Sequence, residues 1–155
     1  MSQIIPILNF EEGFRARPYV DSEGYPTVGT GFLIGPKGAA ISNYTFSLSK
    51  NVSDVWLQEL VDTKTAEMKA SPAVYAAMRN CNPARADVLI SMAYQLGTQG
   101  LAGFKNTLQM ITVGNFTGAA AGMMNSLWAK QTRSRALRHS EVMKTGTYDA
   151  YRGLI

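Results

Sequence analysis

Cysteine and histidine are almost absent from this sequence of 155 residues, since Cys81 is the only cysteine and His139 the only histidine. A single cysteine excludes an intramolecular disulfide, which is typical of a protein made in a reducing compartment. A zinc site is usually built from several cysteine and histidine side chains, and this chain has only one of each. We therefore expect neither a metal ion nor another cofactor.

Long apolar runs are missing as well. The first apolar stretch, residues 4–8, is interrupted by Pro6 and followed closely by Glu11 and Glu12. A signal peptide has a basic start, roughly 7–15 apolar residues and a small-residue cleavage site, and a membrane-spanning helix needs about 20 apolar residues. We expect no stable membrane association and no means of export from the cytoplasm.

Charged residues are also few, but they are unevenly divided, giving a net charge of +4. This excess predicts attraction to polyanions, and by charge alone a nucleic acid and an anionic cell wall are equally good partners. Several of the basic residues gather toward the end of the chain: Arg133, Arg135, Arg138, Lys144 and Arg152.

The hydrophobic pattern predicts two kinds of structure in separate parts of the chain. Ser2 can cap a first helix that runs to about Glu12 and stops at Gly13. Residues 14–34 combine strand-forming side chains with glycine turns, which predicts a small antiparallel sheet, and residues 35–52 look irregular. Ser53 is a good N-cap for a helix to about residue 70. Further helices are expected at 73–80, 83–96, 101–113, 116–129 and 135–144.

Strands confined to one segment and helices elsewhere predict an α+β fold. We expect one domain over residues 1–155, with a sheet lobe at about 14–52, a helical lobe at about 1–12 and 70–155, and a linking helix at about 54–70. A cleft between two such lobes suits an elongated ligand.

Two carboxylic acids near the start of the chain suggest a chemistry for that ligand. Glycoside hydrolysis needs one protonated carboxyl group, which protonates the leaving oxygen, and one ionised carboxylate, which activates water or stabilises positive charge on the sugar. Glu12 lies at a predicted helix end among apolar residues, and Asp21 lies in a polar turn at the edge of the predicted sheet. Their spacing alone occurs in most proteins by chance, so two solvated surface carboxylates are the simpler interpretation of that fact.

The wider motif is more specific. Glu12-Gly13, Tyr19, Asp21, Gly24-Tyr25, Thr27, Gly29 and Gly31 resemble the signature of the T4-type phage lysozymes. The similarity continues through residues 92–97, 103–108, 128–138 and 144–151, and leaves out about 35–52 and parts of 60–80. It implies the lysozyme-like fold, with a small antiparallel sheet lobe, a larger all-helical lobe and an active-site cleft between them.

The resemblance also implies roles for individual residues. Glu12, which precedes Gly13, takes the place of the general acid, and Glu11 does not. Asp21 and Thr27 correspond to the pair that holds the attacking water, an arrangement that suits inversion at the anomeric carbon. Arg135 matches an arginine that lies against the catalytic glutamate and orients it.

The resemblance is less direct for the residues that contact the substrate. Five residues stand where the family meets the glycan or its peptide stem: Glu23, Leu33, Tyr94, Gln95 and Thr107. For Leu33 and Tyr94, simple core packing is an equally good interpretation. The chain departs from the family at three positions, because Phe32 replaces a histidine, Gly122 an asparagine and Leu127 an arginine.

Taken as a member of this family, the protein is expected to be a monomeric endolysin without nucleic-acid partners. It would cut the β-1,4 bond between N-acetylmuramic acid and N-acetylglucosamine in peptidoglycan. It would accumulate in the host cytoplasm and reach the wall in the periplasm after a separate holin opens the membrane. The same domain can also serve in a phage tail that penetrates the wall, although a bare chain of this length favours the free enzyme.

Two other classes of function remain as alternatives. A thiol amidase would pair Cys81 with His139 to cut the peptide stem. Both residues fall in ordinary helical segments, where we expect Cys81 to be an apolar filler or a near-surface thiol and His139 to be solvated. A basic wall-binding or nucleic-acid-binding protein without activity would not need the acid, the turn carboxylate and the hydroxyl together.

Overall fold

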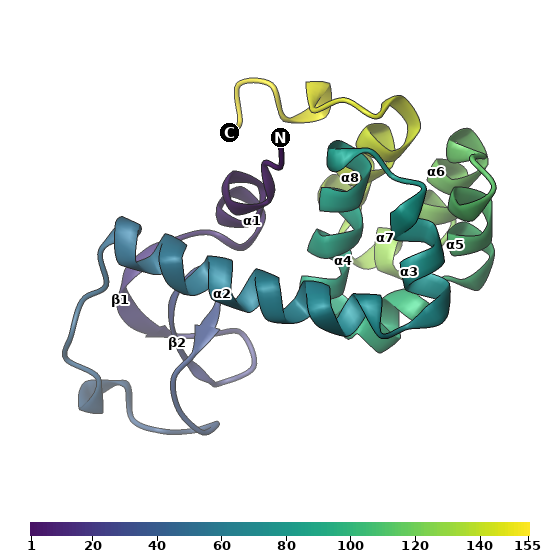
Figure 1. Cartoon of the computed structure of the whole chain (residues 1–155). Coiled ribbons are helices and arrows are strands. Elements are labelled where there is room, and N and C mark those ends of the chain that lie inside the picture. The colour runs from purple at the N-terminus through teal and green to yellow at the C-terminus, as the bar shows by residue number, and fades with distance from the viewer. The chain divides into compact units, whose positions relative to one another are not determined.

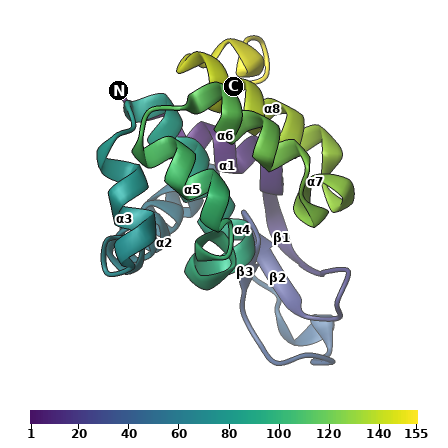
Figure 2. The same cartoon turned by 90° about the vertical axis from the view of Figure 1, so that its right-hand side faces the viewer.

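The computed structural model describes all 155 residues, Met1 to Ile155. It contains eight α-helices and one three-stranded antiparallel sheet (Figures 1 and 2), so the predicted α+β class is confirmed. No helix combines the length and the apolar character needed to cross a membrane. The chain divides into two compact units: residues 5–60, called the sheet unit below, and residues 1–4 with 61–155, called the helical unit.

The sheet unit holds most of helix α1 (Ile4–Glu12), all three strands and the first part of helix α2 (Lys50–Lys69). The strands are β1 (Arg15–Val20), β2 (Pro26–Gly29) and β3 (Phe32–Leu33), with β2 in the centre, and a short 3-10 helix, η1 (Ile41–Asn43), follows them. Tyr19 on β1 lies opposite Thr27 on β2, and Thr27 lies opposite Leu33 on β3. Antiparallel pairing through short turns agrees with the glycine-punctuated pattern of residues 14–34.

Close packing around Gly29 explains why no larger residue stands there. Gly29 has a φ of +65°, and a Cβ atom at this position would lie 2.6 Å from the Phe32 ring and 2.9 Å from Ser53 Oγ. The Phe32 ring is buried and stacks on Trp56 of α2, with ring centroids 4.4 Å apart. The end of β2 therefore lies directly against α2.

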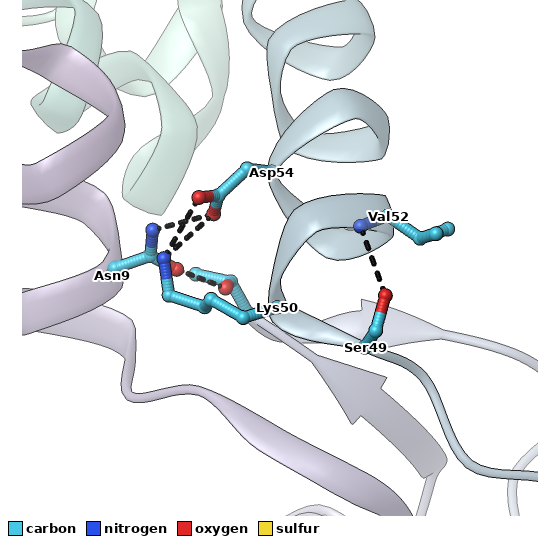
Figure 3. Close-up of polar contacts among 6 residues, drawn as sticks. Asn9, Ser49, Lys50, Val52 and Asp54 are labelled. Atoms are coloured by element: carbon cyan, nitrogen blue, oxygen red, sulfur yellow. Dashed lines mark hydrogen bonds and ion pairs between the residues drawn. The ribbon is translucent and has the colours of Figure 1, made fainter.

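Helix α2 begins earlier than the sequence suggested, and Ser53 is not its N-cap. The helix starts at Lys50, and Ser49 Oγ accepts a hydrogen bond from the Val52 N–H at 3.3 Å (Figure 3). Ser53 lies inside the helix with its hydroxyl buried and without a hydrogen-bond partner. Both serines fit a cap by composition, and packing against Gly29 decides which one is internal.

The helical unit contains the remaining helices, and α8 is at its centre. Its elements are α3 (Pro72–Arg79), α4 (Pro83–Ala102), α5 (Lys105–Thr112), α6 (Phe116–Met124), α7 (Leu127–Gln131), α8 (Arg133–Thr145) and the 3-10 helix η2 (Asp149–Tyr151). Helix α8 packs on α4, α6, α7 and η2, while α5 packs on α3 and α6. Figure 2 shows α5, α6, α7 and α8 as a group of short helices.

Three helix boundaries in this unit differ from the expected ones. Gly97, with φ +79° and ψ 158°, interrupts α4, so the expected end of a helix at residue 96 is confirmed. A second helical segment then continues to Ala102, and α5 begins only at Lys105 rather than at 101. The expected helix over 116–129 is two helices, because Ser126 Oγ accepts from the Ala129 N–H at 3.1 Å and caps a new one. Helix α8 starts at Arg133 rather than 135.

A buried carboxylate on α4 holds both ends of the helical unit's chain. Asp87 accepts hydrogen bonds from Ser2 Oγ at 2.7 Å, from the Gln3 N–H at 2.7 Å and from Tyr148 Oη at 2.5 Å. Burial, together with this bond and the charge of Asp87, raises the pKa of the Tyr148 hydroxyl. A buried charge is tolerated here because several donors satisfy it.

Candidate active site

Glu12 is the last residue of α1 and is partly exposed. The helix ends there because Gly13 takes a positive φ of +77° and its N–H donates to the Asn9 carbonyl at 3.0 Å. Glycine adopts this left-handed conformation without the steric cost of a Cβ atom. The predicted helix stop is confirmed, and it leaves the Glu12 carboxyl at the end of a helix rather than along its side.

Asp21 is held by the turn that joins β1 to β2. Its Oδ1 atom accepts hydrogen bonds from the backbone N–H groups of Glu23 at 2.9 Å and of Tyr25 at 2.8 Å. The Asp21 N–H in turn donates to the Tyr25 carbonyl at 2.9 Å. One carboxylate oxygen is therefore fixed by the backbone, while Oδ2 accepts no hydrogen bond from the protein and is available for chemistry.

Thr27 is buried in the central strand, with only 2% of its surface exposed. Its hydroxyl donates to the Tyr25 carbonyl at 2.9 Å. Because the proton is used in this bond, the lone pairs of Thr27 Oγ1 remain free to accept a hydrogen bond from another group. The residue is thus oriented as an acceptor.

Tyr19 links these residues electrostatically. Burial raises the pKa of its hydroxyl, the Arg15 guanidinium lowers it, and the negative charges of Asp21 and Glu12 raise it further. The guanidinium lies 4.2 Å from the centroid of the Tyr19 ring. Both carboxylates therefore act on a single phenol that lies opposite Thr27, and the sheet unit brings Glu12, Asp21 and Thr27 into one neighbourhood.

Sequence reasoning used Tyr19 as part of the motif but did not identify it or Arg15 as part of the site. The sequence could have indicated Tyr19, because it lies two residues before Asp21, near the end of the strand β1. Alternate residues of an extended chain point to the same face. The position of Arg15 was not predictable in this way, since a register irregularity separates Arg15 from Tyr19 on β1.

The expected substrate residues of the sheet unit are both accessible. Glu23 is exposed in the turn after Asp21. Leu33 is 58% exposed on β3, so the core-packing interpretation of Leu33 is wrong. A large apolar side chain that stays in solvent on a strand next to Thr27 is suited to contact a ligand.

Of the expected substrate residues of the helical unit, Thr107 lines a cavity, and Gln95 is bonded to a residue that lines another. Gln95 and Tyr94 are half-buried on α4, and Gln95 Oε1 accepts a hydrogen bond from Trp128 Nε1 at 2.8 Å. Trp128 lines a cavity of about 420 Å³ together with Leu96, Gly100, Gly103, Phe104, Ser126, Leu127 and Gln131. Thr107 lines a second cavity of about 350 Å³ that also includes Gly122. Gly103 and Phe104 belong to both cavities, which therefore adjoin.

Arg135 is buried in the helical unit, with 8% of its surface exposed. Its Nη2 atom donates to Ser91 Oγ at 2.9 Å and to the Ser91 carbonyl at 3.2 Å. A buried guanidinium held by short hydrogen bonds has a fixed direction, which is what an orienting role requires.

Comparison with known proteins identifies the family of this chain. The sequence profile of the family described as Phage lysozyme matches residues 9–141, which covers most of the chain. The chain belongs to the phage lysozyme family. It is therefore a lysozyme-type cell-wall hydrolase, and the resemblance stated from its motif is confirmed.

Individual relatives of this lysozyme differ in length. It is 28% identical to "Probable T4-type lysozyme 1" of Dictyostelium discoideum, over 98% of the chain and 99% of that protein. It is 30% identical to "Pre-baseplate central spike protein Gp5" of Enterobacteria phage T4, over 94% of the chain but 28% of that protein. It is also 30% identical to "Peptidoglycan hydrolase gp36" of Pseudomonas phage phiKMV, over 81% of the chain and 13% of that protein.

The three departures of this lysozyme from the family's pattern have different structural consequences. Phe32 is buried against Trp56, so an aromatic stack occupies the place of the family's histidine. Gly122 has no room for a side chain, because a Cβ atom there would lie 2.7 Å from Thr107 Oγ1. Leu127 is 69% exposed at the rim of the larger cavity, where it supplies an apolar surface and no charge.

The lysozyme has no cluster of three or more His, Cys, Asp or Glu residues that could hold a metal ion. Nor does it pair Cys81 with His139 as a thiol amidase would. The Cys81 thiol donates to the Ala77 carbonyl at 3.3 Å, and burial raises its pKa to about 11. His139 bonds to Ser91 and Tyr151 instead. The expectation that His139 is solvated is wrong, since the ring is completely buried.

Proposed function

We propose that this lysozyme hydrolyses the β-1,4 bond between N-acetylmuramic acid and N-acetylglucosamine of bacterial peptidoglycan, with inversion. The observation that carries the proposal is the placement of three residues in the sheet unit: Glu12 ends α1, Asp21 directly follows β1, and Thr27 on β2 lies opposite Tyr19. Membership of the phage lysozyme family and the name of the similar peptidoglycan hydrolase support the choice of substrate.

In this mechanism Glu12 is the general acid. Its proton moves to the glycosidic oxygen as the bond from that oxygen to the anomeric carbon breaks. A water molecule attacks the anomeric carbon from the opposite face, and its proton passes to the free Oδ2 of Asp21. The Oγ1 lone pairs of Thr27 accept the water's other hydrogen and thereby aim the oxygen at the carbon. An oriented water held by two acceptors favours inversion over a covalent intermediate.

The remaining site residues act on the substrate or on the acid. Arg135, held by Ser91, orients Glu12 as its counterpart does in the family. The glycan or its peptide stem contacts Glu23, Leu33, Tyr94, Gln95 and Thr107. The exposure of Leu33 and the position of Thr107 in a cavity wall support these contacts.

The test is hydrolysis of purified Gram-negative walls stripped of the outer membrane. Glu12→Gln should abolish lysis and leave the fold intact, while Glu11→Gln, its neighbour on α1, should keep near wild-type activity. Mass spectrometry should find products cut in the glycan, and proton NMR should find the α anomer first. Free stem peptides, binding without cleavage, or a β anomer as the first product would each contradict a stated part of the proposal.

For the biological role we propose a free endolysin that works with a separate holin at the end of phage infection. The similarity to the T4-type lysozyme of Dictyostelium, which extends over 99% of that protein, supports a free enzyme. The 30% identity to the spike protein of phage T4 favours the alternative of a tail lysozyme. The two roles differ in where the protein is found, since an endolysin stays in the cleared lysate and a tail lysozyme sediments with virus particles.

A further inference from the structure

The side chain of Asn9 is bonded at both of its ends to other elements of the sheet unit. Its Oδ1 atom accepts a hydrogen bond from Thr30 Oγ1 at 2.5 Å, and its Nδ2 atom donates to Asp54 Oδ1 at 2.8 Å. Figure 3 shows Asn9 on α1 facing Asp54 and Lys50 on α2. One amide therefore bridges α1, the turn between β2 and β3, and α2.

The chemistry of the partners fixes the direction of this bridge. Asp54 is held in its ionised form, because hydrogen bonds from Lys50 and Asn9 outweigh the effect of burial and lower its pKa. A carboxylate only accepts, so the Asn9 amide nitrogen must face it, and the Asn9 oxygen must then face the Thr30 hydroxyl. Thr30 is fully buried, so this hydroxyl has no solvent with which to replace the bond.

The bridge joins the two segments that carry the proposed reaction. Asn9 lies one helical turn before Glu12 on α1. Thr30 directly follows β2, the strand that carries Thr27. The covalent route between the segments passes through Gly13 at φ +77° and through the register irregularity of β1, so it crosses a helix end and a break in the strand pairing. The relative placement of the acid and the water-holding pair therefore depends on contacts outside that route.

We propose that Asn9 is a positioning residue of this lysozyme. Its amide, held between Thr30 and Asp54, sets the separation of Glu12 from Thr27 and Asp21 that the reaction requires. The inference rests on the proposed roles of those three residues. A misplacement of about 1 Å can lower the rate of an enzyme on the order of a hundredfold, so a bridge of this kind affects the rate more than the affinity.

The test exploits the polarity of the bridge. Asn9→Asp places two carboxylates against each other, and Asn9→Leu removes both hydrogen bonds with little change in volume. Asn9→Asp combined with Asp54→Asn rebuilds the bridge with only the bond between residues 9 and 54 reversed, since the new carboxylate accepts from Thr30 as before and from the new amide. Turnover of a soluble glycan fragment is measured at a temperature at which circular dichroism finds each variant folded.

We expect Asn9→Asp and Asn9→Leu to lower kcat on the order of tenfold or more, with KM changed less than about twofold. The double variant should return kcat to within about twofold of wild type, as coupled neighbours do in a double-mutant cycle. Thr30→Val, which removes one arm, should lower kcat in the same direction and covers the case in which Asn9→Asp does not fold. Val74→Ala, at a fully buried position on α3 in the helical unit, should lower the melting temperature and leave kcat near wild type.

Two outcomes would overturn this inference and leave the proposed mechanism intact. One is a lower melting temperature with unchanged kcat in Asn9→Leu and Thr30→Val, and the other is a kcat loss in Val74→Ala as large as theirs. Full turnover by Glu12→Gln would instead overturn the proposed mechanism, which separates the two failures.

Discussion

His139 Nε2 lies 2.7 Å from Ser91 Oγ in the buried centre of the helical unit. The same hydroxyl oxygen accepts a hydrogen bond from Arg135 Nη2 at 2.9 Å. The other ring nitrogen, Nδ1, faces Tyr151 Oη at 2.9 Å. Ser91 therefore links the imidazole to the arginine that we propose orients Glu12.

This arrangement predicts a loss of stability below neutral pH. The pKa of His139 lies well below its ordinary value, mainly because the ring is buried. The positive charges of Arg135 and Arg138 lower it further. The unfolded chain takes up a proton as the pH falls below about 6.5, whereas the folded protein does not. The free energy of unfolding should therefore be constant above about pH 7 and decrease toward pH 5, by up to about 1.4 kcal/mol per pH unit.

Urea unfolding between pH 5 and 8 measures this slope. His139→Gln removes the titrating group, so its stability, although lower at neutral pH, should vary less across this range. Equal slopes for the wild type and His139→Gln would show that other groups cause the acid sensitivity.

The two serines at the start of α2 should respond in opposite directions to the same substitution. Ser49→Ala removes the hydroxyl that accepts from the Val52 N–H and should cost about 1 kcal/mol. Ser53→Ala removes a buried hydroxyl without a partner, so it should leave stability unchanged or raise it by up to about 1 kcal/mol. Thermal unfolding of both variants provides the comparison, and a large loss in Ser53→Ala would be the contrary result.

Asp21 offers a way to separate the turn from the chemistry. Asp21→Asn keeps an oxygen that can accept from Glu23 and Tyr25 but removes the charge, while Asp21→Ala removes both. Both should lose wall-lysing activity by at least about a hundredfold. Only Asp21→Ala should also lose about 1–2 kcal/mol of stability. Activity in Asp21→Asn close to wild type would exclude Asp21 as the base.

The basic residues near the end of the chain should make activity on walls depend on salt. Of these, Arg135 is buried and Arg152 is paired with Asp149 at 2.6 Å, whereas Arg133 and Lys144 are exposed. Attraction between solvated charges is screened over about 8 Å at physiological ionic strength. Lysis of intact walls should therefore slow as salt rises to several hundred millimolar, and turnover of a soluble muropeptide should change much less.

Arg133→Gln combined with Lys144→Gln should flatten this salt profile on walls and leave the rate on the soluble muropeptide unchanged. If the double variant keeps the wild-type profile, these two cations only solvate the surface and do not draw the enzyme to the wall.

Several features followed from the sequence because their causes are local. Gly13 ends α1 since only glycine takes a positive φ without cost. The turn at Asp21 forms because an aspartate side chain can accept from backbone N–H groups a few residues later. The small sheet follows from strand-forming residues between glycines. These same segments carry Glu12, Asp21 and Thr27, so the motif and the local structure point to the same residues.

Other features depend on residues that are far apart in the chain. By its sequence neighbours His139 could be solvated, and its burial depends on Ser91 and Tyr151 arriving from α4 and η2. Ser49 and Ser53 are both good caps by composition, and the contact with Gly29 makes one of them internal. The Asn9 bridge needs Thr30 and Asp54 from two other elements. Local patterns indicate which segments form helices and strands, but a polar side chain's partner is decided only when packing excludes water from around it.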